Sequence, residues 1–411
     1  MKKMYLSAAA LMCGAVMFAQ NNESTVNQTG SNHDATINQV GQSNLSNLKQ
    51  EVNANLATVN QEGNGNILEN SKLQTSDAPY ARQRQKSVLE LDQIGDGNTL
   101  GLFQRRQKNK AYVLQEGNDN SADVWQRAQN GFVLGNEAFI DQVGDNNTGD
   151  IYQKGDLNVA DIDQSGDGNT ASITQDGFNV APDGGIDNYA TTEQEGDNNE
   201  STTTQEGNSN AAINESFGDG NVADIDQTSS LASGANDNYS NNSQDGNDNT
   251  AKSIQRGNFN FSQNFQNGND NYARSRQLSS GNSSDNYQEG NDNRIEVRQF
   301  GADGNLSSVL QIGDDNSSDV EQFGDGNNSD IDSNGNGNIN DVRQGYQDAI
   351  GAPMSSGSFS TILQNGDFNR SNVTQYGTGH TSTVTQTGTY HMSTVLQVGT
   401  TNISTVTQSN N

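Results

Sequence analysis

Apolar or small side chains alternate with polar ones in short runs along most of the chain. In one such run, Asn169, Ala171, Ile173 and Gln175 are two residues apart and are separated by Thr or Ser. Side chains two apart on a β-strand lie on the same face of that strand. The pattern therefore predicts a strand with amide and aliphatic side chains facing inward and hydroxyl or acidic side chains facing outward. The Gly166-Asp-Gly segment before this strand is typical of a turn.

The same phrase, Gln-x-Gly-x-x-Asn-x-Ala/Ser-x-Val/Ile-x-Gln, recurs every eleven residues, most regularly over 142–175, 244–277 and 364–408. Self-similarity at a fixed short period indicates a stacked array. Alternate copies always keep the first glycine, as at Gly41, whereas the copies between them accept other residues, as at Val52. Insertions also interrupt only this second set of copies. The repeating unit is therefore two phrases, or 22 residues, with one tight edge and one edge that tolerates loops.

These observations predict an all-β fold, a β-solenoid with two strand–turn–strand arches per 22-residue rung and two facing parallel sheets. About seventeen rungs at ~4.8 Å would give a rod on the order of 80 Å long. Residues 20–411 form one solenoid in this prediction. Loop insertions are expected near 73–87, 127–137, 177–187, 228–237 and 345–358, and the three prolines, Pro79, Pro182 and Pro353, fall in them.

The inward amides are expected to form ladders, because a side-chain amide has both donors and an acceptor and can bond to its copies above and below. Without such partners, each buried amide would cost roughly 1–3 kcal/mol. The structural ladder is predicted to include Gln142, Asn147, Gln153, Asn158, Ile162, Gln164, Asn169, Ala171, Ile173 and Gln175.

Composition and charge narrow the class of protein. Only 29% of the residues are hydrophobic, against roughly 45–50% in globular domains. That value alone would indicate disorder, but a disordered chain has no reason to repeat Val or Ile in phase. The formal charge of −30 disfavours binding to nucleic acid or to an anionic membrane surface.

Residues 1–19 resemble a secretory signal peptide. Lys2 and Lys3 precede an apolar run that ends at Phe18, and a small residue, Ala19, follows. The run is too short to span a bilayer. Cys13 is the only cysteine and lies inside this segment, so the secreted chain is expected to have no disulfide.

No catalytic, cofactor-binding or metal site is predicted. Carboxylate pairs occur everywhere and no nucleophile motif stands out. The Asp-Gly-Asn turns, such as the one at Asp167, resemble calcium loops, but the eleven-residue period and single glycine favour turn chemistry over metal binding. His380 and His391 replace the repeat asparagine on opposite edges, and His33 lies in the first arch, so a zinc site is not expected.

Basic residues cluster in one part of the acidic chain. They either compensate charge locally or form a docking patch for an anionic polysaccharide or an acidic neighbouring subunit. Arg127 lies beside this possible docking patch, which consists of Arg82, Arg84, Lys86, Arg105, Arg106, Lys108 and Lys110.

Outward carboxylates, among them Asp161, Asp163, Asp224 and Asp226, are expected to repel across rungs and to retard premature pairing. Outward aromatics are expected to cover the strand surface or to promote lateral contacts. They include Trp125, Tyr189, Tyr239 and Tyr272.

Both ends of the array are predicted to be uncapped. A monomeric solenoid needs polar caps over its open strand edges, yet strand-like residues begin at Ser24 and continue to Gln408. We expect end-to-end pairing in which the last rung of one molecule is completed by the first rung of the next. The predicted assembly ends are Ser24, Val26, Gln28, Ile403, Ser404, Val406 and Gln408.

The doubled phrase behind a signal-like segment resembles the curlin repeat of secreted bacterial amyloid subunits, over about residues 24–408. The resemblance implies a non-enzymatic fibre subunit without cofactors. It also implies export through a curli-type outer-membrane pore, accessory or nucleator partners, and a role in adhesion and biofilm matrix at the cell surface, where polysaccharide or a host surface is a possible contact. The alternative is a monomeric secreted solenoid of the adhesin or ice-binding type, suggested by outward Thr383, Thr385, Thr394 and Thr405.

Overall fold

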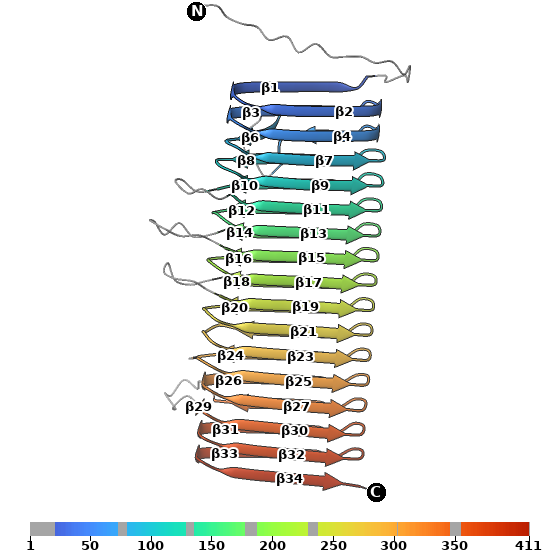
Figure 1. Ribbon diagram of the computed structural model, residues 1–411. Helices are drawn as coiled ribbons and strands as arrows, with labels where there is room; N and C mark the ends of the chain where they lie inside the picture. Colours follow the sequence, from blue (N-terminus) through green and yellow to red (C-terminus); the bar gives the residue numbers. More distant parts are fainter. Residues whose placement is uncertain are drawn as a thin grey trace, which may run out of the picture.

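The computed structural model describes residues 21–72, 80–128, 135–176, 187–228, 237–301, 303–345 and 355–410. In these residues the chain forms a single stack of rungs, with its first strand at one end and its last strand at the other (Figure 1). The described residues contain no helix, and every strand pairing is parallel. This confirms the predicted all-β solenoid with two facing parallel sheets.

The strands alternate between two sheets, which we call sheet A and sheet B. Sheet A consists of β1 (Glu23–Ser31), β3 (Leu45–Asn53), β5 (Ile67–Glu69), β6 (Ala81–Arg84), β8 (Thr99–Arg105), β10 (Ser121–Arg127), β12 (Thr148–Lys154), β14 (Thr170–Asp176), β16 (Glu200–Glu206), β18 (Val222–Thr228), β20 (Thr250–Arg256), β22 (Tyr272–Gln277), β24 (Arg294–Phe300), β26 (Ser317–Asp325), β28 (Ile339–Gln344), β29 (Ser355–Ser356), β31 (Arg370–Thr378) and β33 (Met392–Thr400).

Sheet B faces it and has sixteen strands, one for each rung, which is one rung fewer than the sequence suggests. It consists of β2 (Asp34–Gln42), β4 (Leu56–Asn64), β7 (Val88–Ile94), β9 (Lys110–Glu116), β11 (Glu137–Val143), β13 (Val159–Ser165), β15 (Tyr189–Glu195), β17 (Ala211–Phe217), β19 (Tyr239–Asp245), β21 (Phe261–Asn267), β23 (Ser283–Glu289), β25 (Leu306–Ile312), β27 (Asn328–Asn334), β30 (Phe359–Asn365), β32 (Thr381–Thr387) and β34 (Ile403–Ser409).

The register places each residue on its counterpart in the neighbouring rung. Ile140 pairs with Ile162 and Gln142 with Gln164 between β11 and β13. The β12–β14 pair repeats this for the facing sheet, where Gln153 lies beside Gln175. Identical inward side chains therefore form columns along the rod.

The edge that follows the sheet B strands is a tight glycine turn. Gly166 has φ +118°, and a Cβ added there would lie 2.1 Å from the carbonyl oxygen of Gly196 in the next rung. The stacked turns are too close for any side chain at this position. The other edge is looser, because Val52 and Arg106 adopt φ +79° and +74° at the equivalent place. This difference explains why only one set of copies tolerates substitutions.

Most insertions lie on that looser edge. The predicted loops near 127–137, 177–187, 228–237 and 345–358 follow β10, β14, β18 and β28, all in sheet A. Much of each loop, all three prolines and the signal-like segment 1–19 lie outside the described residues.

The predicted first insertion, 73–87, has the wrong bounds. Residues 81–84 form β6, which pairs with β3 in register, so Gln83 lies beside Gln50 in the ladder. Lys72, which has the regular eleven-residue spacing, is exposed instead. The insertion therefore divides one sheet A strand into two parts, β5 and β6, which both pair with β3. Gln83, in the second part, supplies the amide of the glutamine column.

The core is not uniformly aliphatic. One apolar cluster extends from Leu48 to Ile225 and a second from Ile295 to Val395. Between them, the position expected to hold Val or Ile is occupied by Asn242, Ser253, Asn264, Ser275 and Asn286, all fully buried.

Hydrogen bonds connect this polar part of the core. Asn264 donates from Nδ2 to Oδ1 of Asn242 at 2.8 Å, and Asn286 donates in the same way to Asn264 at 2.7 Å. Ser253 bridges the sheets by donating to Asn242 Oδ1 at 3.0 Å. The repeat thus tolerates loss of the aliphatic column where a second amide column replaces it.

Candidate assembly surfaces

The first and last strands of each sheet have an open edge. Among the described residues, β1 pairs only with β3 and β2 only with β4. At the other end, β33 pairs only with β31 and β34 only with β32. Among the described residues, each end of the rod therefore presents two open strand edges, one in each sheet.

Core side chains are uncovered at the N-terminal end. Ser24, Val26 and Gln28 pair with the buried residues Ser46, Leu48 and Gln50. Val26 is 42% exposed, whereas Leu48 is completely buried. The inward column continues to the surface here, and among the residues that the structure describes it has a neighbour on one side only.

The C-terminal end has the same arrangement. Ser404, Val406 and Gln408 pair with Ser382, Val384 and Gln386, and Val406 is only partly buried against the second apolar cluster. Ile403 differs, because it has the opposite parity and lies on the outer face, 80% exposed.

The backbone groups at these edges alternate in direction. Glu23 donates its N–H to the Asn44 carbonyl at 2.8 Å, so the N–H groups of Ser24 and Val26 face the open side. At the other end, Thr381 donates to the Asn402 carbonyl at 2.9 Å, which leaves the N–H of Thr405 facing outward from the stack. Each end offers unpaired donors and acceptors with the spacing of an ordinary parallel ladder.

The glutamine column of sheet A is continuous from Gln28 to Gln397. At every step, Nε2 of one glutamine donates to Oε1 of the next at 2.8–3.0 Å. The second Nε2 hydrogen crosses the core, as in Gln153, which donates to the Glu137 carbonyl at 2.8 Å. The column is therefore polar, with an acceptor at its N-terminal end and a donor at its C-terminal end.

The glutamine column of sheet B has the same direction but is interrupted twice. It extends from Gln39 to Gln194, where Ser216 occupies the next position, and it breaks again at Ser333. The last segment ends at Gln408, whose Oε1 accepts from Gln386 at 2.7 Å.

All ten residues of the predicted structural ladder are buried. Asn147 Nδ2 donates to the Gly166 carbonyl at 2.7 Å, and its Oδ1 accepts the backbone N–H of Asn169 at 2.9 Å. Each repeat asparagine in this column thus ties the tight glycine edge to the next rung.

The histidines replace asparagine structurally. His380 is completely buried, and its Nε2 lies 2.9 Å from the Tyr376 carbonyl, four residues back. Asn44 makes the same contact with Val40 at 3.2 Å. His391 lies 3.0 Å from the Thr387 carbonyl in the equivalent way.

The Asp-Gly-Asn turn at Asp167 belongs to a hydrogen-bonded column of turns along the tight edge. The backbone N–H of Asp145 donates to Asp167 Oδ1 at 2.8 Å, and Asp167 N–H donates to Asp197 Oδ1 at the same distance. Asn occurs at this position as well as Asp, as in Asn247, because only an Oδ1 acceptor is required. In the described part of the chain, no group of three or more His, Cys, Asp or Glu side chains could hold a metal ion.

Part of the possible docking patch is neutralised within the molecule. Arg82 and Arg84 contact the Glu51 carboxylate at 2.8 and 2.5 Å, and Lys49 contacts it at 2.8 Å. Burial opposes ionisation of Glu51, but these three cations together lower its pKa to about 2. Lys110 pairs with Glu137 at 2.5 Å.

Arg105, Arg106 and Arg127 have no acidic partner within ion-pair distance among the described residues. Burial and the neighbouring guanidinium groups lower the pKa of Arg105 and Arg106. Of the remaining patch residues, Lys86 and Lys108 lie in the turns at the looser edge, both with positive φ.

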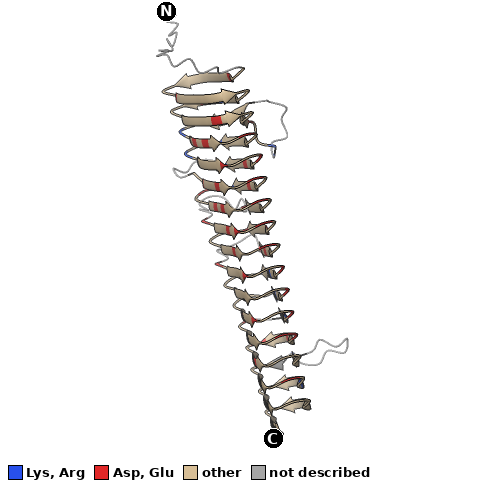
Figure 2. Cartoon of the chain, turned by 90° about the vertical axis from the view of Figure 1, so that its right-hand side faces the viewer, with Lys and Arg blue, Asp and Glu red and all other residues tan. Residues whose placement is uncertain are grey.

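Only one of the four outward aspartates lies directly beside carboxylates in the neighbouring strands, although the pKa of Asp161 is raised by burial and then by Asp163 and Asp141. Asp163 pairs with Asp141 and Glu193 in adjacent strands. Asp161 lies between Phe139 and Thr191, and Asp226 lies between Thr204 and Ile254. Asp224 forms an ion pair with Lys252. Figure 2 shows that acidic residues nevertheless recur along the length of the rod.

Outward aromatic residues stack across rungs. Trp125 lies between Phe103 and Tyr152, with ring centroids 5.8 and 4.3 Å away. Although Trp125 has outward parity, it is only 7% exposed. Tyr239 stacks on Phe261 at 5.3 Å, Tyr272 lies under the guanidinium of Arg294, and Tyr189 is exposed.

One buried charge was missed by sequence reasoning. Asp123 has outward parity but is 3% exposed, because the chain after β5 crosses the sheet and the Lys72 N–H donates to Asp123 Oδ2 at 2.5 Å. Gly101 allows this crossing, since a Cβ there would lie 3.0 Å from the Cα of Ser71. Burial raises the pKa of Asp123 to about 6. Only the glycine at position 101 signals this approach in the sequence.

In the part of the chain that the structure describes, the fold and its open end strands define a class of protein, the β-solenoid built from a two-arch repeat. The family model for the curlin associated repeat matches residues 90–126, 144–177, 185–213 and 360–388. The chain is a curlin-repeat protein. A search of curated proteins found no match.

The described residues contain no helix with the length and apolarity needed to cross a membrane.

Proposed function

We propose that the protein is the structural subunit of extracellular curli-like amyloid fibres, which assemble end to end and serve surface adhesion and the biofilm matrix. The match to the curlin associated repeat supports a structural role of the curli type. The predicted signal peptide and an outer-membrane secretion pore with accessory or nucleator proteins belong to the same proposal.

The observation that carries the proposal is the complementarity of the two ends. The last rung presents β33 in sheet A and β34 in sheet B, and the first rung presents β1 and β2 in the same two sheets. A second molecule placed on the C-terminal end therefore extends both sheets without a change of strand order. The donor end of each glutamine column then meets the acceptor end of the next molecule.

Burial of exposed apolar residues favours such a junction. Val26 at one end is 42% exposed, and Val406 at the other is only partly buried against the core. Each apolar side chain removed from water contributes roughly 1.5–3 kcal/mol. The open backbone edges add parallel hydrogen bonds along the whole rung.

Seeded growth tests this function. Fragmented fibres added to purified protein should abolish the lag in thioflavin fluorescence, because every fragment supplies two ready ends. A rod that stays monomeric at high concentration and ignores seeds would contradict it.

The threonine distribution gives little support to the monomeric ice-binding alternative. Thr383 and Thr405 lie in one column of sheet B, beside the column of Thr385, whereas Thr394 lies in sheet A. The four threonines therefore do not form one flat face.

A further inference from the structure

Two unpaired charge arrays of opposite sign lie on different sheets of the rod. On sheet A, Arg84, Arg105, Arg127 and Lys154 follow the ladder glutamine in consecutive rungs, and Arg105 pairs in register with Arg127 and Arg127 with Lys154. Glu51 neutralises Arg84 at one end of this guanidinium column, and Asp176 neutralises Lys154 at 2.8 Å at the other. Arg105 and Arg127 remain without a carboxylate between them.

Like charges in adjacent strands destabilise a sheet. The pKa of Arg105 is lowered by its burial and then by Arg127, Arg84 and Arg82. Within one molecule, the guanidinium groups of Arg105 and Arg127 therefore repel each other. Carboxylates that approach these two side chains from outside the molecule would replace this repulsion by attraction.

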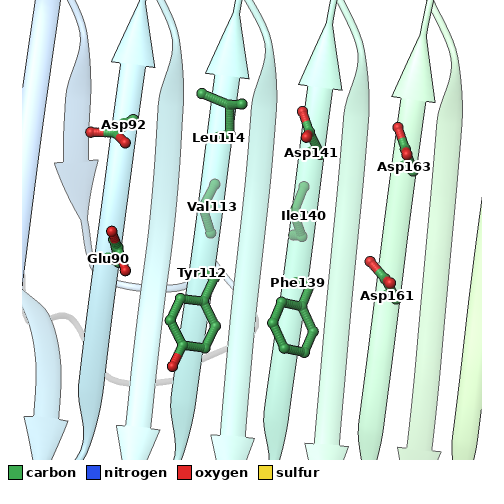
Figure 3. Close-up of a pocket in the computed structure, with 10 residues that line it drawn as sticks. All are labelled: Glu90, Asp92, Tyr112, Val113, Leu114, Phe139, Ile140, Asp141, Asp161 and Asp163. Carbon is green, nitrogen blue, oxygen red and sulfur yellow. The ribbon is translucent and has the colours of Figure 1, made fainter.

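On sheet B, the outer face has a shallow groove with a volume of about 340 Å³. We call it the acidic aromatic groove. Its lining includes Tyr112, Phe139, Asp141, Asp161 and Asp163. Figure 3 shows Asp141 and Asp163 in one row across the strands, and Tyr112, Phe139 and Asp161 in the row beside it.

The groove has the chemistry of a guanidinium site. The Tyr112 and Phe139 rings are stacked with centroids 5.1 Å apart and present an aromatic surface, on which an Arg side chain can stack. Asp141 and Asp163 have no ion pair within the described residues, and Asp141 Oδ1 is buried without a hydrogen-bond partner. Burial and the charge of Asp163 raise the pKa of Asp141.

We propose that rods dock side by side, with Arg105 and Arg127 of one molecule inserted into the acidic aromatic groove of a second copy. The spacings match, because adjacent arginines and adjacent aspartates are both separated by one strand, or ~4.8 Å. A second copy neutralises both arrays at once, whereas an anionic polysaccharide would neutralise only the arginines. This second-copy docking does not depend on end-to-end growth.

The docking is heterologous, since the column and the groove lie on different sheets of the same molecule. A heterologous contact that does not close can continue from copy to copy. Such docking therefore produces lateral bundles of rods or fibres instead of isolated pairs.

A charge-reversal experiment tests the docking. Arg105→Glu/Arg127→Glu removes the cations, and Asp141→Arg/Asp163→Arg reverses the groove. Side-by-side rods are counted by negative-stain electron microscopy, which separates them from end-to-end contacts, and circular dichroism verifies the β-fold. Each variant alone should show at least roughly tenfold fewer lateral contacts than the unmodified protein, because close charge pairs across interfaces couple by about 1.5 kcal/mol or more.

An equimolar mixture of the two variants should restore lateral contacts, because each supplies the array that the other lacks. Arg256→Glu/Arg370→Glu is the matched control. It makes the same change in charge at exposed arginines and should leave bundling intact. Raising the salt from 0.1 to 1 M should disperse the bundles, since the Debye length falls from about 10 to about 3 Å.

Unchanged bundling in both variants, or no recovery in the mixture, would overturn the proposal. It would also be overturned if Arg105→Glu/Arg127→Glu lost binding to polygalacturonate, a polyanionic sugar, while its bundling stayed intact. Failure of end-to-end growth would appear separately, as short rods that still lie side by side.

Discussion

Gln28 donates its Nε2 hydrogen to Oε1 of Gln50 at 2.8 Å, and each later glutamine up to Gln375 donates to the next glutamine in the same direction. Among the described residues, no group donates to Oε1 of Gln28, whereas the last glutamine, Gln397, donates to the carbonyls of Thr381 and Asn402 instead of to another glutamine. This polarity favours head-to-tail contact between molecules. It disfavours contact between two like ends, where donor would face donor or acceptor would face acceptor.

Proline at the open edge should stop growth. The N–H of Thr405 faces away from β32, so Thr405→Pro removes no hydrogen bond inside the molecule but leaves a carbonyl of the incoming strand unpaired. At roughly 1–3 kcal/mol for a buried unpaired group, elongation of seeded fibres should slow by about tenfold or more. Thr405→Val keeps the N–H and should elongate normally. Equal rates for both variants, measured by thioflavin fluorescence, would show that β34 is not the growing edge.

The interrupted column in sheet B can be repaired. Ser216 is buried between Gln194 and Gln244, so Ser216→Gln should join the two halves of the column. The new amide would accept from Gln194 and would replace the hydrogen bond that Ser216 Oγ donates to Gln244 Oε1 at 3.1 Å, so the free energy of unfolding should rise by about 1 kcal/mol. Denaturant titration measures this change, and Ser216→Ala should lower the value. A repaired variant less stable than the alanine variant would mean that the site cannot hold the longer side chain.

Alanine at the tight edge should be far more costly than alanine at an open glycine. In Gly166→Ala, the Cβ would approach the Gly196 carbonyl within 2.1 Å at φ +118°, so a loss of roughly 3 kcal/mol or more is expected. Gly326 has φ +62° and no atom within 4 Å of its Cβ position, so Gly326→Ala should cost only about 1 kcal/mol. Similar losses in denaturant titration would contradict the stacked-turn explanation.

Acidification should first stabilise the rod. The pKa of Asp123 is about 6 in the folded chain and about 3.9 when unfolded. Between these values the folded state binds more protons, so the free energy of unfolding should rise as the pH falls from 7 to about 4, by on the order of 3 kcal/mol from this group. Asp123→Asn should weaken this dependence in melting curves recorded at several pH values.

Below about pH 4, the free energy of unfolding should fall again as the pH is lowered. The pKa of Glu51 falls from 4.5 to about 2 on folding, so its contribution is complete above about 4.5 and is lost as the pH falls toward 2. In Asp123→Asn, this loss of stability at low pH should remain, because Glu51 is unchanged. Stability that falls steadily from pH 7 downward in the unmodified chain would contradict the assignment to Asp123.

The fold was predictable because one phrase encodes it many times. Gln153 and Gln175 are equivalent in both the sequence and the stack, and the invariant glycine at Gly166 follows from the close approach of successive turns. A single copy would not have distinguished inward amides from surface ones. Repetition at a constant phase made the distinction.

Features that occur once were not predictable in the same way. Regular spacing favoured Lys72 over Gln83 as the ladder residue, because the period alone does not show where an insertion interrupts a strand. The burial of Asp123 depends on a crossing segment close in space but about fifty residues earlier in the chain.

The amide column of Asn242, Asn264 and Asn286 was present in the sequence as a 22-residue repeat, but the aliphatic consensus obscured it.

The most direct test of the account is an electron cryomicroscopy structure of fibres grown from the purified protein. We predict that β33 of one molecule pairs in parallel with β1 of the next, and β34 with β2, at the ordinary strand spacing of ~4.8 Å. The glutamine columns should pass through the junction without a change of direction. A junction with a gap or a reversed molecule, or ends covered by other parts of the chain, would contradict the central claim.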